Sequence, residues 1–164
     1  MTAFVTLGVL DALEAPTVPL FPVEPVPAPG PDPRLWPEIE RQKAFITYIR
    51  RTSPDLIAFA IPNAGKRSQW AAGKAKAEGL LPGAADVCIC WDWRKSTQDD
   101  PARSVAFVEI KGFDKNGKPG KLSPSQIAFG NSCFERGIAY GCFYTATAAL
   151  LWLASLGAPL RGKL

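Results

Sequence analysis

A run of prolines between residues 16 and 37 constrains this chain more than any other part of its sequence. Nine of the 22 residues in this stretch are proline. Because proline lacks a backbone N–H and fixes φ at about −65°, such a segment can form neither a helix interior nor a central strand. We therefore expect residues 1–36 to be a disordered proline-rich tail that the fold does not need, and residues 37–164 to form the folded domain.

The absence of histidine limits the chemistry available to that domain. None of the 164 residues is His, which excludes His-based triads, His-ligated zinc and His general bases. Carboxylates, lysines, thiols and hydroxyls remain. The formal net charge of +4 suits a polyanionic partner such as nucleic acid, although a surplus of this size does not identify one.

The cysteines favour buried thiols in a reducing, cytoplasmic location. Cys88 and Cys90 alternate along an apolar run, so both side chains point to one face of a strand. No C-x-x-C pair occurs, which argues against a four-thiolate zinc site. Residues 1–15 lack the basic start of a signal peptide, which agrees with a cytoplasmic protein.

The hydrophobic pattern predicts an α/β domain. We expect helices over residues 37–51, 69–78, 123–136 and 146–156, and strands over residues 56–61, 87–93, 105–111 and 138–144. This order, α-β-α-β-β-α-β-α, is typical of a mixed sheet flanked by helices. A flexible basic loop is expected over residues 113–121. Residues 138–160 are nearly uncharged and long enough to span a bilayer, but Gly141, Gly157 and Pro159 divide them, so we expect no membrane insertion.

The residues that carry chemistry lie at the ends of the two expected strands 87–93 and 105–111. Glu109 and Lys111 alternate along one strand and therefore point to the same face. Asp86 stands where the preceding strand begins. If the two strands are antiparallel neighbours, the start of one lies beside the end of the other, and Asp86 and Glu109 can share a metal ion.

Carboxylate oxygens of this kind suit Mg²⁺ or Mn²⁺. Such an ion would polarise a phosphodiester and acidify water, and Lys111 would orient or deprotonate that water or stabilise developing charge. The same Glu-x-Lys pattern is also common as an exposed ion pair on a strand, so these residues alone leave a metal-independent interaction protein as an alternative.

Five sequence blocks, taken in order, resemble the VRR-NUC (virus-type replication-repair nuclease) branch of the PD-(D/E)XK nuclease superfamily. The blocks are PEIERQKA (residues 37–44), IPNAGKR (61–67), GLLPGAADV (79–87), FVEIK (107–111) and LSPSQ (122–126). Each is short, and their order and spacing over residues 37–156 carry the resemblance. The chain departs from the family at Ala85, where the family usually has a proline that shapes the turn before the metal-binding Asp.

The resemblance implies a restriction-endonuclease-like fold and a metal-dependent deoxyribonuclease. It assigns metal binding to Asp86, Glu109, the Ile110 backbone carbonyl and an acidic residue of the first helix, and it makes Lys111 catalytic. That acid is Glu38, with Glu40 as the other choice because the helix register is open by two residues. The resemblance also places Gln126 in the catalytic site. The residues expected at the nucleic acid are Asn63, Gly65, Lys66, Arg67 and Lys121.

The expected partner is DNA, cut in a structure-selective way at flaps, junctions or replication and repair intermediates, and a homodimer would supply a second DNA contact. A different class of function is a nucleic-acid-binding module on the same fold that does not cleave. Asn63 and Gly65 also suit an ordinary turn, and Lys66 and Arg67 also suit a solvated surface. Metal titration with a DNA substrate separates the nuclease, the non-cleaving module and the metal-independent interaction protein.

Overall fold

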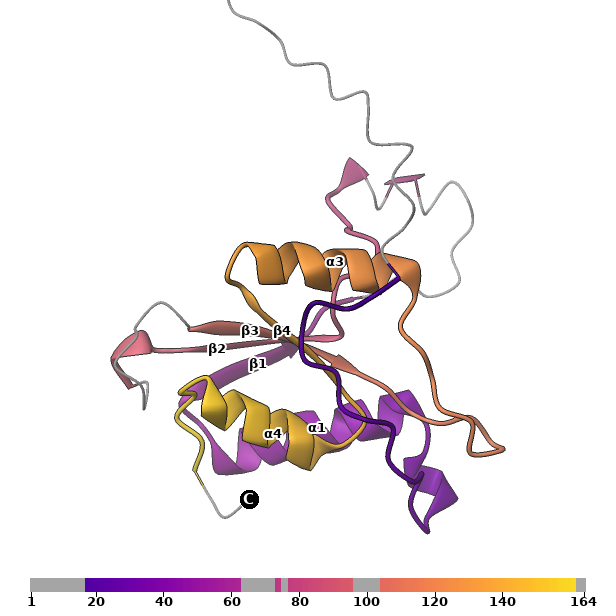
Figure 1. Ribbon diagram of the computed structural model, residues 1–164. Coiled ribbons are helices and arrows are strands. Elements are labelled where there is room, and N and C mark those ends of the chain that lie inside the picture. Colours follow the sequence, from indigo (N-terminus) through magenta and orange to yellow (C-terminus); the bar gives the residue numbers. More distant parts are fainter. Residues whose placement is uncertain (1–16, 63–72, 75–76, 96–103, 162–164) are drawn as a thin grey trace, which may run out of the picture.

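The structure, a computed structural model, describes residues 17–62, 73–74, 77–95 and 104–161. A four-stranded sheet lies between α3 on one face and α1 and α4 on the other (Figure 1). Residues 73, 74 and 77, within the second expected helix, are helical. The elements are η1 (Pro33–Leu35), α1 (Glu38–Thr52), β1 (Leu56–Ala60), β2 (Val87–Trp91), η2 (Trp93–Lys95), β3 (Val105–Ile110), α3 (Pro124–Glu135), β4 (Ala139–Phe143) and α4 (Ala146–Ser155). The expected order of helices and strands is confirmed for these elements, and β2 ends two residues earlier than expected.

Local signals in the sequence account for the helix ends. α1 begins after Pro37 and carries acidic residues in its first turn and basic residues in its last, which complements the helix dipole. α3 has a capping box, in which the Ser123 side chain accepts from the Gln126 amide and the Gln126 side chain accepts from the Ser123 amide. The Thr145 hydroxyl accepts from the Ala148 amide at the start of α4.

The sheet has the order β1-β2-β3-β4 and is mixed. β1 pairs antiparallel with β2, β2 pairs antiparallel with β3, and β3 pairs parallel with β4. Val87, the first residue of β2, lies opposite Val108 near the end of β3. The start of β2 therefore lies beside the end of β3, as the sequence predicted.

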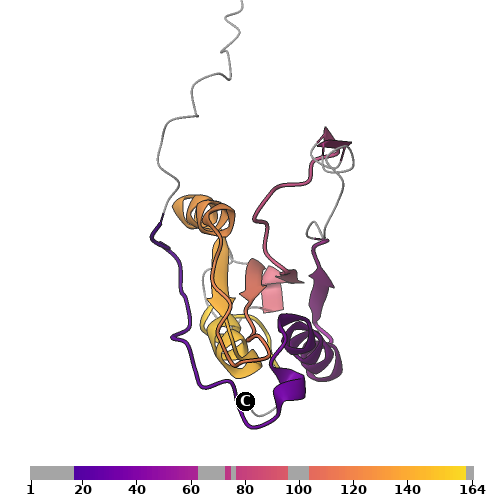
Figure 2. The same cartoon turned by 90° about the vertical axis from the view of Figure 1, so that its right-hand side faces the viewer.

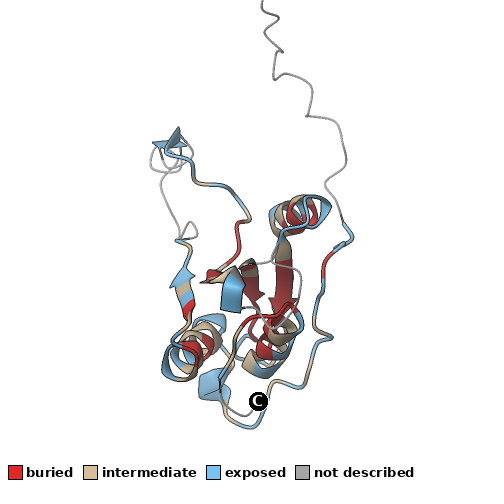
Figure 3. Cartoon of the chain, turned by 90° about the vertical axis from the view of Figure 1, so that its left-hand side faces the viewer, coloured by how far each residue is buried: buried red, intermediate tan, exposed pale blue. Residues whose placement is uncertain are grey.

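Two apolar clusters hold the layers together, and buried residues concentrate along the sheet (Figure 3). The larger cluster joins the sheet to α1 and α4 and includes Phe45, Ile49, Ile110 and Leu153. The smaller cluster lies on the α3 side and consists of Phe21, Ala85, Cys133, Tyr140 and Cys142. Because side chains alternate along β3, Val108 and Ile110 enter the larger cluster and Glu109 points to the α3 side.

The prediction of a disordered tail is wrong for residues 17–36, which we call the strap. The strap runs along the side of the domain formed by α3, β4 and α4 (Figure 2). Val23 forms a parallel bridge with Cys142, with Cys142 N–H donating to Pro22 O at 3.0 Å and Glu24 N–H donating to Cys142 O at 2.9 Å. Phe21 is buried, and its ring centroid lies 4.5 Å from that of Tyr140. Residues 1–16 lie outside the described residues.

Polar contacts fix the strap to the beginning of α4 and to α1. The Glu24 carboxylate accepts from the backbone amides of Tyr144 and Thr145 at 2.7 and 2.9 Å and from the Thr145 hydroxyl at 2.8 Å. Arg41 of α1 donates to Pro29 O at 2.9 Å. The prolines exclude regular structure here, yet carboxylate and carbonyl oxygens remain free to bond to the domain. None of the described helices is long and apolar enough to cross a membrane.

Candidate metal centre

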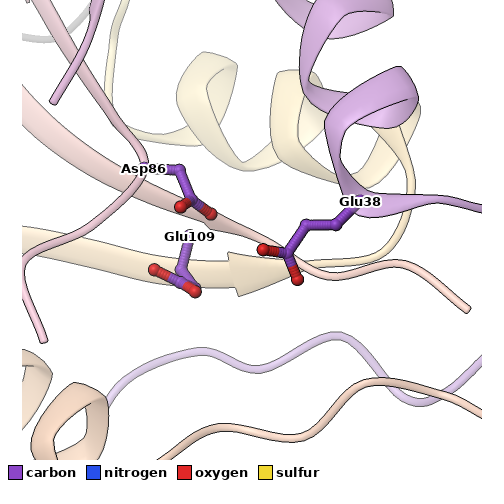
Figure 4. Close-up of side chains that lie close together, drawn as sticks. All are labelled: Glu38, Asp86 and Glu109. Atoms are coloured by element: carbon purple, nitrogen blue, oxygen red, sulfur yellow. The ribbon is translucent and has the colours of Figure 1, made fainter. Parts of the chain in front are cut away.

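Three carboxylates converge where β2 begins and β3 ends. Glu38, Asp86 and Glu109 each offer an oxygen, and these oxygens lie within 4.8 Å of one another. Glu38 comes from the first residue of α1, Asp86 from the position before β2, and Glu109 from β3 (Figure 4). The expected approach of the Asp86 and Glu109 carboxylates on neighbouring strands is thus confirmed.

Backbone contacts set this convergence. The Ile110 amide donates to Asp86 Oδ2 at 2.9 Å, which ties the start of β2 to the end of β3. Since the N–H and C=O of one strand residue point to the same side, the Ile110 carbonyl is directed toward the Asp86 side of β3. Gly112 brings α1 to the site, because a Cβ there would lie 2.3 Å from Glu38 N. A larger residue at position 112 would push the first turn of α1 away from β3.

Glu109 is the most buried member of the cluster, with none of its surface exposed. Its Oε1 accepts from Lys111 Nζ at 2.6 Å and from Gln126 Nε2. Its Oε2 is buried without a hydrogen-bond partner among the described residues. Burial, with the nearby Asp86 charge, raises the pKa of Glu109 to about 8 even though Lys111 opposes the shift.

Lys111 points to the same side as Glu109, as expected from their alternation. Its Nζ lies 2.6 Å from Glu109 Oε1 and 3.6 Å from Glu38 Oε2, and the residue is 5% exposed. Burial lowers the pKa of Lys111, but the carboxylates of Glu109, Glu38 and Asp86 outweigh burial, so the pKa is raised and the ammonium stays charged. Burial likewise raises the pKa of Glu38.

The donor set fits a hard divalent cation. Three carboxylates face a single ammonium group, so the ionised cluster has a net negative charge that a cation would neutralise. The buried Glu109 Oε2, which lacks a partner, is a polar atom that a metal ion would satisfy. Because the cluster contains only carboxylate oxygens, it suits Mg²⁺ or Mn²⁺ better than zinc.

The structure resolves the choice between the two acidic residues of α1. Glu38 joins the cluster, whereas Glu40 forms an exposed ion pair with Lys43 at 2.7 Å. Residues two apart on a helix point to different sides, so only one of the two can face the site.

Gln126 lines the site, and the way it does so was not evident from the sequence. Its side-chain oxygen accepts from the Ser123 amide at 2.9 Å while its side-chain nitrogen donates to Glu109. The cap of α3 thereby fixes the orientation of the Gln126 amide toward the buried carboxylate.

The residues expected at the nucleic acid are only partly described. Asn63, Gly65, Lys66 and Arg67 lie outside the described residues. Lys121 is exposed and leads from Gly120, beside the site, into α3.

None of the described thiols belongs to the carboxylate cluster, although Cys142 of β4 lies opposite Glu109 of β3. Cys88, Cys133 and Cys142 are buried, as predicted, and Cys90 is half-buried. Burial raises the pKa of Cys88 and Cys142 to about 12, which keeps both thiols protonated in the metal-free protein.

Sequence reasoning missed the two glycines that shape the edge of the site. Gly112 follows Lys111 directly, and a Cβ at Gly120 would lie 3.6 Å from Lys111 Cδ and 3.9 Å from Glu38 Oε2. A pair of glycines bracketing a basic segment just after a Glu-x-Lys strand was the available signal.

Family models, curated proteins and solved structures gave no match to this chain.

Proposed function

We propose that this chain is a Mg²⁺- or Mn²⁺-dependent nuclease that hydrolyses phosphodiester bonds in DNA, on a restriction-endonuclease-like domain of the VRR-NUC type. The observation that carries the proposal is the convergence of three carboxylates, from Glu38, Asp86 and Glu109, in one site with the buried Lys111 ammonium. The Glu109 carboxylate also has one oxygen, Oε2, without a hydrogen-bond partner among the described residues. A surface ion pair, the simplest alternative for a Glu-x-Lys strand, would be exposed. Here both residues are buried.

Each side chain has a distinct task in this proposal. Glu38, Asp86 and Glu109 would hold the ion, which when bound supplies the charge that polarises a phosphodiester and acidifies water. The Lys111 ammonium, fixed by Glu109, would donate hydrogen bonds to the phosphate oxygens as negative charge develops on them. Gln126 would keep the Glu109 carboxylate in one orientation. Water then adds across one P–O bond, and the products are a phosphate monoester and a hydroxyl group.

The choice of DNA and the cutting of branched structures rest on the VRR-NUC resemblance. A homodimer would give so small a domain a second contact with DNA. The substrate experiment below tests the choice of DNA and the cutting of branched structures directly.

A panel of labelled duplex, flap, splayed and four-way DNAs, incubated with Mg²⁺ or Mn²⁺, tests the proposal. We expect cleavage by the wild-type protein and none by Glu109→Gln, which keeps the shape of the side chain but removes its charge. Glu40→Gln is the matched control, since it neutralises an acid of α1 that faces away from the site, and it should cleave normally.

Two results would replace the proposal. DNA binding without cleavage in either metal would favour the non-cleaving module. Equal activity of Glu109→Gln and Glu40→Gln would show that the observed cleavage does not come from this cluster.

A further inference from the structure

The lysines of the described residues divide into two groups. Lys43, Lys74, Lys95 and Lys111 each form an ion pair with a carboxylate. The others are exposed and make no ion pair with any described residue; they are Lys115, Lys118 and Lys121. All three lie in one segment, residues 113–121, directly after the strand that carries Glu109 and Lys111.

This segment is an ordered turn, which we call the basic hairpin, rather than the flexible loop predicted from the sequence. Phe113 and Pro119 form an antiparallel bridge, and the Asp114 carboxylate accepts from the amides of Asn116 and Lys118 at 2.8 and 2.9 Å. Gly117 turns the chain with φ at 75°. The backbone that carries the three lysines is therefore fixed.

The basic hairpin is also anchored to the body of the domain. Phe113 N–H donates to Trp36 O at 2.7 Å, and the Tyr144 hydroxyl donates to Gly120 O at 2.7 Å. The Phe113 ring is buried against Tyr144 and beneath the Arg41 guanidinium, 4.9 Å from the ring centroid. The strap and the residue that follows β4 thus hold the hairpin in place beside the metal centre.

A pocket of about 220 Å³ joins the hairpin to the metal centre. Glu38 and Lys118 both line this pocket, and the backbone of Gly112 and Gly120 contributes to its wall. It is smaller than the roughly 300–1,000 Å³ typical of sites for drug-sized ligands. Its size suits one phosphate with its sugar rather than a whole small-molecule substrate. Lys118 supplies the positive charge of a lining that also includes the carboxylates of Glu38 and Asp114.

We propose that the basic hairpin is a phosphate-binding element in which Lys118 contacts the backbone phosphate next to the scissile one, with Lys115 and Lys121 continuing the contact along the strand. This inference rests on the proposed nuclease function and adds to it a second binding position. Ammonium groups that form no ion pair can neutralise DNA phosphates without first breaking one. Each phosphate contact should therefore release the counterions of that phosphate and contribute its full share to the salt dependence of DNA binding.

Salt-dependent binding of short labelled DNA, single-stranded and duplex, tests this inference. Fluorescence anisotropy with Ca²⁺, which we expect to support binding without cleavage, would be measured at several salt concentrations. Lys118→Ala should reduce the slope of log K against log[salt] by about 0.9 for duplex or about 0.7 for single strands. Lys118→Arg should restore the wild-type slope. Lys95→Ala is the charge-matched control, because Lys95 follows β2 at the end of that strand away from Asp86, and its slope should not change.

Substitution of single phosphates locates the contact. A methylphosphonate, which removes the charge of one phosphate, would be moved along the DNA one position at a time. We expect wild-type binding to weaken at the position beside the cleavage site and Lys118→Ala to be insensitive there, as required for a coupled pair.

The outcomes separate this inference from the function on which it rests. Normal wild-type binding with equal slopes for Lys118→Ala and Lys95→Ala would refute the hairpin as a phosphate-binding element and leave the nuclease proposal standing. Failure of the wild-type protein to bind or cleave any DNA would refute both. Because Lys118 is exposed, its variants should melt with the wild-type protein.

Discussion

Because Phe21 packs against Gly130, we expect the effect of Gly130→Ala on stability to change sign when Phe21 is replaced by alanine. Phe21 of the strap is 6% exposed and lies against α3, where a Cβ added at Gly130 would come within 2.2 Å of Phe21 Cε1. Gly130→Ala should therefore destabilise the wild-type protein, since the Phe21 ring must move. In a Phe21→Ala background the same change should stabilise the protein, because the clash is gone and alanine favours a helix over glycine.

The magnitudes follow from burial. A buried Phe removes roughly 150–200 Å² from water, which at about 25 cal/mol per Å² corresponds to roughly 4–5 kcal/mol. Since part of the cavity closes and alanine buries some area, we expect Phe21→Ala to cost about 3–4 kcal/mol. That loss corresponds to a fall in Tm of roughly 6–16 °C for a chain of this length. Gly130→Ala should cost about 1–3 kcal/mol in the wild-type protein and gain up to about 1 kcal/mol in the Phe21→Ala protein.

Urea unfolding of the four proteins in this double-mutant cycle provides the measurement. Val26→Ala is the control within the strap, because Val26 is 55% exposed and its loss should change stability by less than about 0.5 kcal/mol. A cost below about 1 kcal/mol for Phe21→Ala, or stabilisation by Gly130→Ala in the wild-type protein, would refute the docking of the strap.

Three further predictions concern the metal centre. Because the pKa of Glu109 is raised to about 8 in the folded protein from its ordinary value of 4.5, the metal-free protein should lose stability as pH rises from about 4.5 to 8, by up to about 5 kcal/mol. Urea unfolding against pH should show this slope, and Glu109→Gln should flatten it. Lys111→Ala should lower the cleavage rate by roughly 10²–10⁴-fold while DNA affinity measured with Ca²⁺ stays near wild type; a parallel loss of affinity would make Lys111 a phosphate anchor instead. Mn²⁺ should raise the Tm of the wild-type and Glu40→Ala proteins but not that of Glu38→Ala. Zinc measured after dialysis should be substoichiometric; stoichiometric zinc would instead point to binding by the thiols.

The centre of the site was predictable because strand periodicity is simple. Alternation places Glu109 and Lys111 on one face, and antiparallel pairing brings Asp86 beside them, so neither step needs knowledge of distant packing. Burial of the pair was not predictable in this way. It depends on Gln126 and on how closely the glycines let α1 and the basic hairpin approach, which tertiary packing determines.

The strap shows where reading the sequence by composition failed. Proline density excluded regular elements correctly, but it carries no information about side-chain docking. Phe21 and Glu24 lie among the prolines and make the decisive contacts, one with the core beneath α3 and the other with the start of α4. A buried aromatic residue and a carboxylate at a helix N-terminus can secure a segment without a helix or a sheet of its own.

The bridge between Val23 and Cys142 also determines how the molecule can associate with copies of itself. β1 and β4 form the two edges of the described sheet, and the strap occupies the edge at β4. No strand of the described residues pairs with the other edge of β1, which presents exposed Ile57 and Phe59. Two copies joined through β1 would use their last open edges, and growth would stop at a pair. With the strap detached, each copy would have two open edges, and the same sheet could extend without limit into a fibre.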